Sequence, residues 1–443
     1  MKKTLTKIMG LAFAVVMIAG LFSACSKKDK ASSSGNSDKP IEITFWHVYS
    51  ENFGAPVIKE MVETFNASQD KIIVKDVYNA DMYPGLMQNL QAEVASGNYP
   101  SIVMIGYNYL KYFAANFNYT SPEDIITKYV PDDKNYLSET FLDNILSLAQ
   151  VDGKQVGIPF SISTPILYYN ADLFRAAGLD PDKIPETWTE VREYAKQITE
   201  KTGEYGFYMQ EYADNWAVQG LLEGNGARIL SDDGLAAFAS PEAVEAYQLL
   251  ADMVLVDKSA LHITADEGIQ AFINGKVGIF VGTSAKIGTI QSGAQFDLRG
   301  GKFPVFEGKD RRVPAGGNFL AIMSQKEDEQ KAAWEFIKFV MQSEWLAKWC
   351  QNTGYLPPRQ EVAEDPDGLK DYIAENQLMG AAFSEMDGIY PWAAFPGDVG
   401  TRAEQLFADT RDKILGGEAT PQEALEAAQK ELNELLSEYK KSN

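Results

Sequence analysis

Strand and helix patterns alternate from residue 41 onward, and this order constrains the fold more than any other feature of the chain. The β-rich segments 41–46, 71–78 and 101–105 are separated by apolar residues at helical spacing in 57–65 and 83–96. Such alternation predicts an α/β lobe with a mainly parallel sheet. Ligands of these sheets bind outside the carboxyl ends of the strands, so the loops after Trp46, Tyr78 and Ile105 are candidate binding loops.

The remainder of the chain continues the same alternation. Segments 166–169 and 277–281 are predicted strands, and Thr187, followed by Glu190, has the spacing of a capping box that opens a helix. Ser240 and Thr420 each precede a proline at the first position of a further predicted helix. The 443 residues suffice for two or three domains.

The N-terminus has the pattern of an export signal. Residues 1–7 contain three lysines and no acid, and residues 8–22 contain no charge. This apolar run is shorter than the ~20 residues that a membrane-spanning helix needs. Small residues just before Cys25 are similar to the lipobox of bacterial lipoproteins, although Phe22 stands where leucine is usual. An ordinary cleavage site that happens to lie near a cysteine is the alternative.

We therefore expect a signal peptide over residues 1–24 and a lipidated Cys25 that anchors the protein to the outer face of the cell membrane. Residues 26–39 are rich in serine, lysine, aspartate and glycine and contain no large apolar side chain. This composition predicts a flexible linker that extends to about residue 40.

The charge and the scarcity of two residue types exclude several classes of protein. The chain has 40 Lys plus Arg against 62 Asp plus Glu, a net charge of -22, whereas a nucleic-acid binder needs a basic face. Two histidines and two cysteines argue against a zinc site and against a disulfide-stapled scaffold. We predict no nucleic-acid partner, no metal site and no cofactor.

Several blocks, in order along the chain, together resemble the bacterial extracellular solute-binding proteins of sugar-type ABC importers. The blocks lie at 43–47, 96–100, 167–174, 177–180, 187–188, 272–277, 316–318 and 354–357. No single block is decisive, but the block LYYNADLF at 167–174 and the order of all the blocks together are hard to obtain without such a relationship. The most similar branch holds the glycerol-3-phosphate and oligosaccharide binders.

The resemblance implies a two-lobed periplasmic-binding-protein fold of the α/β class with the ligand cleft between the lobes. The first lobe is expected to hold 41–160 and 300–340, and the second 161–299 and 341–443. It also implies a monomeric, extracytoplasmic binding protein, not an enzyme, that closes on a small carbohydrate and delivers it to ABC transporter permease subunits.

The resemblance also implies particular ligand contacts. Five positions match contacting residues of the branch, namely Tyr83, Ser163, Thr283 with Ser284 beside it, Gly317 and Tyr355.

Two departures from the branch bear on the ligand. Tyr107 stands where the phosphate-ester binders carry an acid, and Ala394 stands where they carry an arginine suited to phosphate. Arg402 is near enough to substitute for that arginine. The departures favour a neutral carbohydrate.

Other candidates rest on chemistry and placement. A sugar needs hydrogen-bonding groups for its hydroxyls and flat aromatic surfaces for its C–H faces, and a carboxylate can accept from two adjacent hydroxyls. Side chains of these kinds follow the predicted strands or gather in aromatic segments, and those we select are Trp46, His47, Glu51, Asp81, Tyr212, Trp216 and Trp392.

Three alternatives stay open. A glycerol-3-phosphate or glycerophosphodiester binding protein is the nearest. A secreted glycoside hydrolase would need paired carboxylates, but with 62 acidic residues finding a pair means little, and none of the blocks is a hydrolase motif. A binder of a polyamine or a metal ion is the third, although no Asp-rich loop of the EF-hand kind is present.

Overall fold

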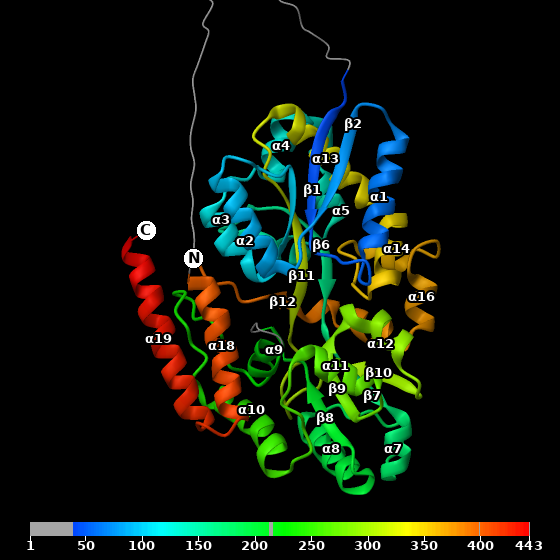
Figure 1. Ribbon diagram of the computed structural model, residues 1–443, viewed down its shortest axis with the longest axis vertical. Helices are drawn as coiled ribbons and strands as arrows, with labels where there is room; N and C mark the ends of the chain where they lie inside the picture. The colour runs from blue at the N-terminus through cyan, green and yellow to red at the C-terminus, as the bar shows by residue number, and fades with distance from the viewer. Residues whose placement is uncertain (1–38, 212–215, 398, 443) are drawn as a thin grey trace, which may run out of the picture. The chain divides into compact units, whose positions relative to one another are not determined.

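The computed structural model describes residues 39–211, 216–397 and 399–442 (Figure 1). Residues Pro40–Asn443 form one compact unit. The expected signal peptide, Cys25, nearly all of the expected linker and Tyr212 lie outside the described residues. A search of the described helices finds none with the length and apolar character needed to cross a membrane.

Two separate sheets organise the compact unit, and Figure 1 places them toward its upper and lower ends. The first has the order β12-β11-β3-β1-β2, with β6 also paired to β11; its strands are β1 (Ile41–His47), β2 (Ile72–Tyr78), β3 (Ile102–Gly106), β6 (Ile158–Ser163), β11 (Val313–Ile322) and β12 (Ile389–Pro391). The second has the order β10-β7-β9-β8, with β7 (Pro165–Asn170), β8 (Tyr205–Met209), β9 (Val277–Thr283) and β10 (Leu298–Lys302). A small hairpin joins β4 (Gln150–Val151) to β5 (Lys154–Gln155).

The predicted α/β architecture is confirmed, and the predicted strands are present within a residue or two of their expected ends. The start of the first sheet is parallel, as expected, because β1 pairs in parallel with both β2 and β3. The sheet as a whole is mixed, since β11 runs antiparallel to β3 and to β6. Ten consecutive buried residues make β11 a central strand with apolar contacts on both faces.

Helices cover the faces of both sheets, and the longer ones bury an apolar stripe. Around the first sheet lie α1 (Ala55–Ser68), α2 (Met82–Ala95), η1 (Tyr107–Tyr109), α3 (Leu110–Asn116), α4 (Pro122–Tyr129), η2 (Pro131–Asp133), α5 (Tyr136–Thr140), α6 (Asp143–Ser147), α13 (Glu327–Val340) and α14 (Ser343–Thr353). Around the second lie α7 (Ala171–Ala177), α8 (Trp188–Thr202), α11 (Ala265–Ile273), η4 (Ser284–Lys286), α12 (Ile287–Gly293) and α17 (Gln377–Phe383).

Two long C-terminal helices run along one side of the compact unit (Figure 1). In Figure 1, α18 and α19 run beside α10, which they contact. The remaining bounds are α9 (Trp216–Gly224), α10 (Pro241–Ala251), η3 (Asp252–Val256), α15 (Gln360–Glu364), α16 (Lys370–Glu375), η5 (Met386–Gly388), α18 (Val399–Leu415) and α19 (Pro421–Ser442). The predicted capping box of α8 is present, since Thr187 and Glu190 exchange side-chain to backbone hydrogen bonds.

The chain passes from the first sheet to the second between β6 and β7 and returns between β10 and β11. The boundaries that we expected for the lobes differ from the sheets in three short segments. Residues 161–163, expected in the second lobe, complete β6 of the first sheet. Residues 300–302, expected in the first lobe, lie in β10 of the second sheet, and β12, expected in the second lobe, pairs with β11 of the first sheet. The full assignment of residues to two lobes stays a proposal.

Candidate ligand cleft

A cleft of about 400 Å³ lies where the ends of strands from both sheets meet. Eight of the predicted site residues line it, namely Asp81, Tyr83, Ser163, Trp216, Thr283, Gly317, Tyr355 and Trp392. The other lining residues are Phe53, Met82, Pro84, Asn108, Tyr109, Gln210, Asp266, Ala285, Lys286, Gly316 and Glu404. We call this set the central cleft.

Two glycines in β11 allow the central cleft to form. A Cβ atom on Gly317 would lie 2.0 Å from the carbonyl oxygen of Ser161, and the φ angle of Gly317 is +112°. A Cβ atom on Gly316 would lie 2.5 Å from Oγ of Ser163 and 2.9 Å from the ring of Trp216. Glycine therefore lets β11 approach β6 closely and leaves room for the two side chains that line the cleft.

A buried amide positions the hydroxyl of Tyr83. Nδ2 of Asn318 donates to the hydroxyls of Tyr49 and Tyr83, at 2.7 and 2.9 Å. Burial raises the pKa of Tyr49 to about 12 and the pKa of Tyr83 well above its usual value, so both phenols stay protonated. Each phenol accepts from Asn318 and keeps a proton that it can donate.

Aromatic rings form two walls of the central cleft. The ring of Tyr355 lies nearly parallel to that of Trp349, with 6.0 Å between centroids and 7° between planes. Nε1 of Trp349 donates to Ser161 at 3.0 Å, which fixes the supporting ring. On the other wall the rings of Trp216 and Trp392 are 6.2 Å apart, and Nε1 of Trp216 donates to the carbonyl of Pro314 at 3.1 Å. Each wall offers a rigid ring with a fixed orientation.

The loop after β9 brings polar groups to the central cleft. The hydroxyl of Thr283 accepts from the N–H of Ala285 at 3.2 Å, which fixes the turn. The N–H of Thr283 donates to Oε1 of Gln210 at 3.0 Å. Among the described residues Nε2 of Gln210 has no hydrogen-bond partner, although the side chain is only 3% exposed.

A second buried amide in the central cleft is also incomplete. Oδ1 of Asn108 has no hydrogen-bond partner within the described part of the chain, and Asn108 is 8% exposed. Buried polar groups without partners cost free energy, so such groups in a cleft indicate a polar ligand. Gln210 offers a donor and Asn108 an acceptor.

Charged groups also reach the central cleft. Nζ of Lys286 lies 4.4 Å from the ring centroid of Phe53, and burial lowers the pKa of the lysine. Three carboxylates line the same cleft, on Asp81, Asp266 and Glu404, and Glu404 is 8% exposed.

The turn that leads into α2 is strained at the edge of the central cleft. Asp81 and Met82 both have positive φ angles, of 62° and 54°. Side chains other than glycine rarely adopt this conformation, and such strain often accompanies functional sites. The turn places Asp81, Met82 and Tyr83 together in the lining.

Four of the predicted residues do not line the central cleft. His47 is 1% exposed, and its Nδ1 accepts from the N–H of Tyr49 at 3.2 Å. Burial lowers the pKa of His47. Trp46 is half-buried in β1, and exposed Glu51 pairs with Lys59. Tyr107 is buried and stacks on Phe319 with 6.1 Å between ring centroids.

Three further positions are accounted for elsewhere. Oγ of Ser284 is buried and accepts from the N–H of Thr164 at 3.3 Å. Arg402 is exposed and pairs with Glu431 at 2.5 Å, so it does not take the place of the arginine that the branch carries in its cleft. Ala394 is 5% exposed and lines a neighbouring hollow. We leave Arg402, Ser284 and the four residues above out of the proposed site.

Sequence reasoning missed Gln210, Asn108, Lys286 and Asn318 as functional side chains. Gln210 and Asn108 each follow the end of a strand, at β8 and β3. The rule that ligands bind beyond strand ends would have selected Asn108, which follows the predicted strand 101–105. It would not have selected Gln210, because β8 was not among the predicted strands. No sequence signal that we used pairs Asn318 with Tyr83, which is 235 positions away in the chain.

One group of described side chains could hold a cation. Ligand atoms of Glu211, His262 and Asp412 all lie within 4.8 Å of one another. Oε2 of Glu211 is 2.7 Å from Nδ1 of His262 and 3.4 Å from Nε of Arg411. The hydrogen bond to Glu211 raises the pKa of His262. This carboxylate thus already faces two basic groups, and the group fits an ion-pair network better than a metal site.

A family model of bacterial extracellular solute-binding proteins matches residues 60–378. The chain belongs to this family. Among the curated solute-binding relatives, the sn-glycerol-3-phosphate-binding periplasmic protein UgpB of Escherichia coli (strain K12) is 27% identical over 441 residues, which cover 92% of this chain and 95% of the relative.

Solved structures of solute-binding proteins have the same fold. The cyclic alpha-maltosyl-1,6-maltose binding protein from Arthrobacter globiformis superimposes with a TM-score of 0.75 at 24% identity, covering 90% of this chain and 99% of that chain. UgpB from Mycobacterium tuberculosis, in complex with glycerophosphocholine, superimposes with a TM-score of 0.78 at 21% identity and the same coverage. The predicted two-lobed periplasmic-binding-protein fold is confirmed.

Membership in the family establishes the general function. The chain is an extracytoplasmic solute-binding protein of an ABC importer, and the family implies a small-molecule ligand and permease subunits as partners.

Proposed function

We propose that this solute-binding protein captures a carbohydrate whose neutral rings occupy the central cleft. The observation that carries the proposal is the pair of incomplete buried amides, Gln210 and Asn108, in a cleft walled by aromatic rings. Neutral hydroxyls both donate and accept, so they can satisfy the donor of Gln210 and the acceptor of Asn108. The rings of Tyr355 and Trp392 suit the apolar C–H faces of a sugar.

The remaining cleft groups support the same ligand class. The phenol of Tyr83 accepts from Asn318, and burial raises its pKa so that it also keeps a proton for donation. The carboxylates of Asp81 and Asp266 can each accept from two hydroxyls. The names of similar proteins agree with this proposal, since they include binders of maltose and maltotetraose.

The cleft also suggests how binding could be coupled to delivery. Its lining comes from both sheets, with Gly317 of β11 from the first and Thr283 of β9 from the second. A ligand that contacts both favours the closed form over the open form, because it gains interactions only when the two sides meet. We propose that the closed form is the one that the permease accepts.

One observation favours glycerol 3-phosphate or a glycerophosphodiester as the second candidate. Lys286 is the single basic side chain among the described residues that line the central cleft, and it could face a phosphate. The three carboxylates on Asp81, Asp266 and Glu404 would repel that phosphate, so the neutral sugar remains the better fit. The names of UgpB relatives, which bind glycerol 3-phosphate or glycerophosphocholine, make this candidate worth testing.

A thermal-shift screen tests the ligand class. The purified protein is melted alone and with maltose, maltotriose, tagatose, glycerol 3-phosphate or glycerophosphocholine. A ligand at 100 times its Kd stabilises the folded state by about 2.7 kcal/mol, which raises Tm by a few degrees. We expect a shift with at least one neutral sugar; a shift with the two phosphate esters alone would overturn the neutral-carbohydrate proposal.

We further propose that the protein binds without catalysis, as a monomer tethered through a lipid on Cys25. Incubation with maltotriose followed by chromatography should return the sugar intact, and detectable glucose would favour a glycoside hydrolase.

Mass spectrometry of the protein from the membranes of its host should find a lipid on Cys25. Recovery of the protein in the soluble fraction, with free Cys25 or a cleaved N-terminus elsewhere, would contradict the anchor.

A further inference from the structure

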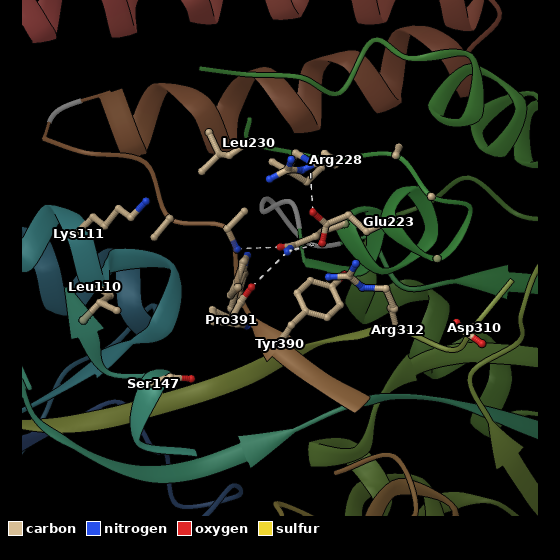
Figure 2. Close-up of a pocket in the computed structure, with 18 of the residues that line it drawn as sticks. Leu110, Lys111, Ser147, Glu223, Arg228, Leu230, Asp310, Arg312, Tyr390 and Pro391 are labelled. Carbon is tan, nitrogen blue, oxygen red and sulfur yellow. Dashed lines mark hydrogen bonds between the residues drawn. The ribbon is translucent and has the colours of Figure 1, made fainter. Parts of the chain in front are cut away.

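A second, larger hollow adjoins the central cleft and has a different chemistry. Its volume is about 780 Å³, and Figure 2 shows part of its wall with Lys111, Arg228 and Arg312 around it. Trp392 lines both the hollow and the central cleft, so the two spaces share one wall. We call this second space the basic hollow.

The charge of the basic hollow is opposite to that of the protein. Four basic side chains line it, on Lys111, Arg228, Lys309 and Arg312, against the two carboxylates of Glu223 and Asp310. The whole chain carries a net charge of -22. Basic groups that come from three separate segments and gather at one hollow of an acidic protein create a local site for anions.

The basic side chains have few anionic partners. Among the described residues, no ion pair is formed by Lys111, Lys309 or Arg312, whereas Arg228 pairs with Asp232 at 2.6 Å. The walls of the hollow partly desolvate the ammonium of Lys111 and lower its pKa, although the side chain as a whole is exposed. These cations are available to an anion that enters the hollow.

Arg312 is held in a defined position. Its guanidinium carbon lies 4.8 Å from the ring centroid of Tyr390, and Figure 2 shows the two side chains one against the other. Stacking on a ring leaves the edge of a guanidinium, with its N–H donors, free to bind. This geometry suits a carboxylate or phosphate, which accepts two parallel hydrogen bonds.

One of the two carboxylates is already occupied. Glu223 accepts from Nε2 of Gln219 at 3.1 Å and from the N–H of Ile229 at 3.2 Å (Figure 2). Asp310 is exposed at the rim, next to Lys309 in the chain. Neither carboxylate forms an ion pair within the described part of the chain that would neutralise Lys111 or Arg312.

We propose that the basic hollow is an anion subsite for acidic oligosaccharides, whose charged group lies there while an uncharged ring occupies the central cleft. The proposal rests on the proposed function of the central cleft and extends its ligands from neutral sugars to sugars that carry a carboxylate or a phosphate. Trp392 lines both spaces, which places the anion subsite next to the central cleft.

Matched ligands test the subsite by calorimetry. Maltose is compared with maltobionate, its carboxylate analogue, and with maltose 1-phosphate, and sodium phosphate alone is titrated separately. We expect the two acidic sugars to bind about 3- to 10-fold more tightly than maltose at low salt, and the advantage to shrink in 0.5 M NaCl. Equal Kd values for the three sugars would overturn the proposal.

A double variant locates the effect. Lys111→Gln with Arg312→Gln should remove the advantage of the acidic sugars and leave the Kd of maltose unchanged. Lys196→Gln, at an exposed position of α8 outside the hollow, is the matched control. It should change neither the Kd of maltose nor the advantage of the acidic sugars. An advantage that survives in the double variant would overturn the proposal.

Sodium phosphate separates the remaining outcomes. Phosphate binding that the double variant abolishes supports the anion subsite, with free phosphate as one source of the anion. If no sugar binds, the proposed function fails. Binding of sodium phosphate to wild type, and its loss in the double variant, then decides whether the basic hollow is an anion subsite. If neither sugar nor phosphate binds, both proposals fail.

Discussion

Gln210 offers a substitution whose effects on folding and on binding can be separated. Its Oε1 accepts from the N–H of Thr283 at 3.0 Å, and its Nε2 has no partner among the described residues. Gln210→Met keeps the length of the side chain and removes both polar atoms. The variant therefore leaves one buried N–H unpaired and withdraws one donor from the central cleft.

The two consequences have different magnitudes. An unpaired buried donor lowers the free energy of unfolding by about 1–3 kcal/mol, so the ligand-free protein should melt at a lower temperature. Loss of one hydrogen bond to a ligand costs about 0.5–1.5 kcal/mol, which weakens binding by about 2- to 10-fold. Maltotriose is the first probe, or another neutral sugar if the thermal-shift screen selects one.

Calorimetry at a temperature where both proteins are folded measures the Kd, and a thermal melt without sugar measures stability. Gln405→Met is the matched control, because Gln405 is exposed on α18 and donates to Asp409. It should leave the Kd and Tm nearly unchanged. A Gln210→Met protein with a lower Tm and the original Kd would refute the assignment of Nε2 to the ligand.

Three other predictions concern backbone geometry, pH and an aromatic wall. Gly317→Ala should lower the free energy of unfolding by at least about 2 kcal/mol, because the added Cβ meets the carbonyl oxygen of Ser161 at 2.0 Å. Gly153, with a φ of +77° and open space around it, is the control, and Gly153→Ala should lower the same free energy by only about 1 kcal/mol. Urea titrations measure both losses, and equal losses would contradict the steric argument. Burial raises the pKa of Glu385 to about 8, so above pH 4.5 the unfolded chain binds fewer protons than the folded protein and stability should fall as pH rises toward 8. Thermal melts from pH 5 to 8 should show that the Tm of wild type falls relative to the Tm of Glu385→Gln as the pH rises. Parallel plots of Tm against pH would refute a protonated Glu385. Tyr355→Phe should retain most of the affinity for maltotriose and Tyr355→Ala should lose it, since the ring forms the wall; equal Kd values for the two variants would contradict this role.

Local signals predicted much of the fold because they act within a few residues. The alternation of residues 41–46 gave β1, and the capping-box spacing gave the start of α8. The antiparallel pairing of β11 with β3 joins residues more than 200 positions apart, and no local pattern specifies such a pairing.

The site residues likewise fall into a group that the sequence predicted well and a group that it predicted poorly. Positions implied by the family resemblance, such as Tyr83, Ser163 and Tyr355, do meet in one cleft, since a shared fold brings the same positions together. Fewer of the positions chosen for being near a strand end line the cleft, because the choice did not consider the direction in which each side chain points. His47 follows Trp46 in β1, yet its side chain points into the protein and is 1% exposed.

Whether the aromatic cleft holds a neutral sugar is best decided by calorimetric titration of neutral sugars into wild-type protein and into Tyr355→Ala. We predict that wild type binds at least one sugar of the maltose series with one site per chain, and that the folded variant does not. Binding of the same sugar by Tyr355→Ala with the wild-type Kd would contradict the claim that the aromatic cleft holds the ligand.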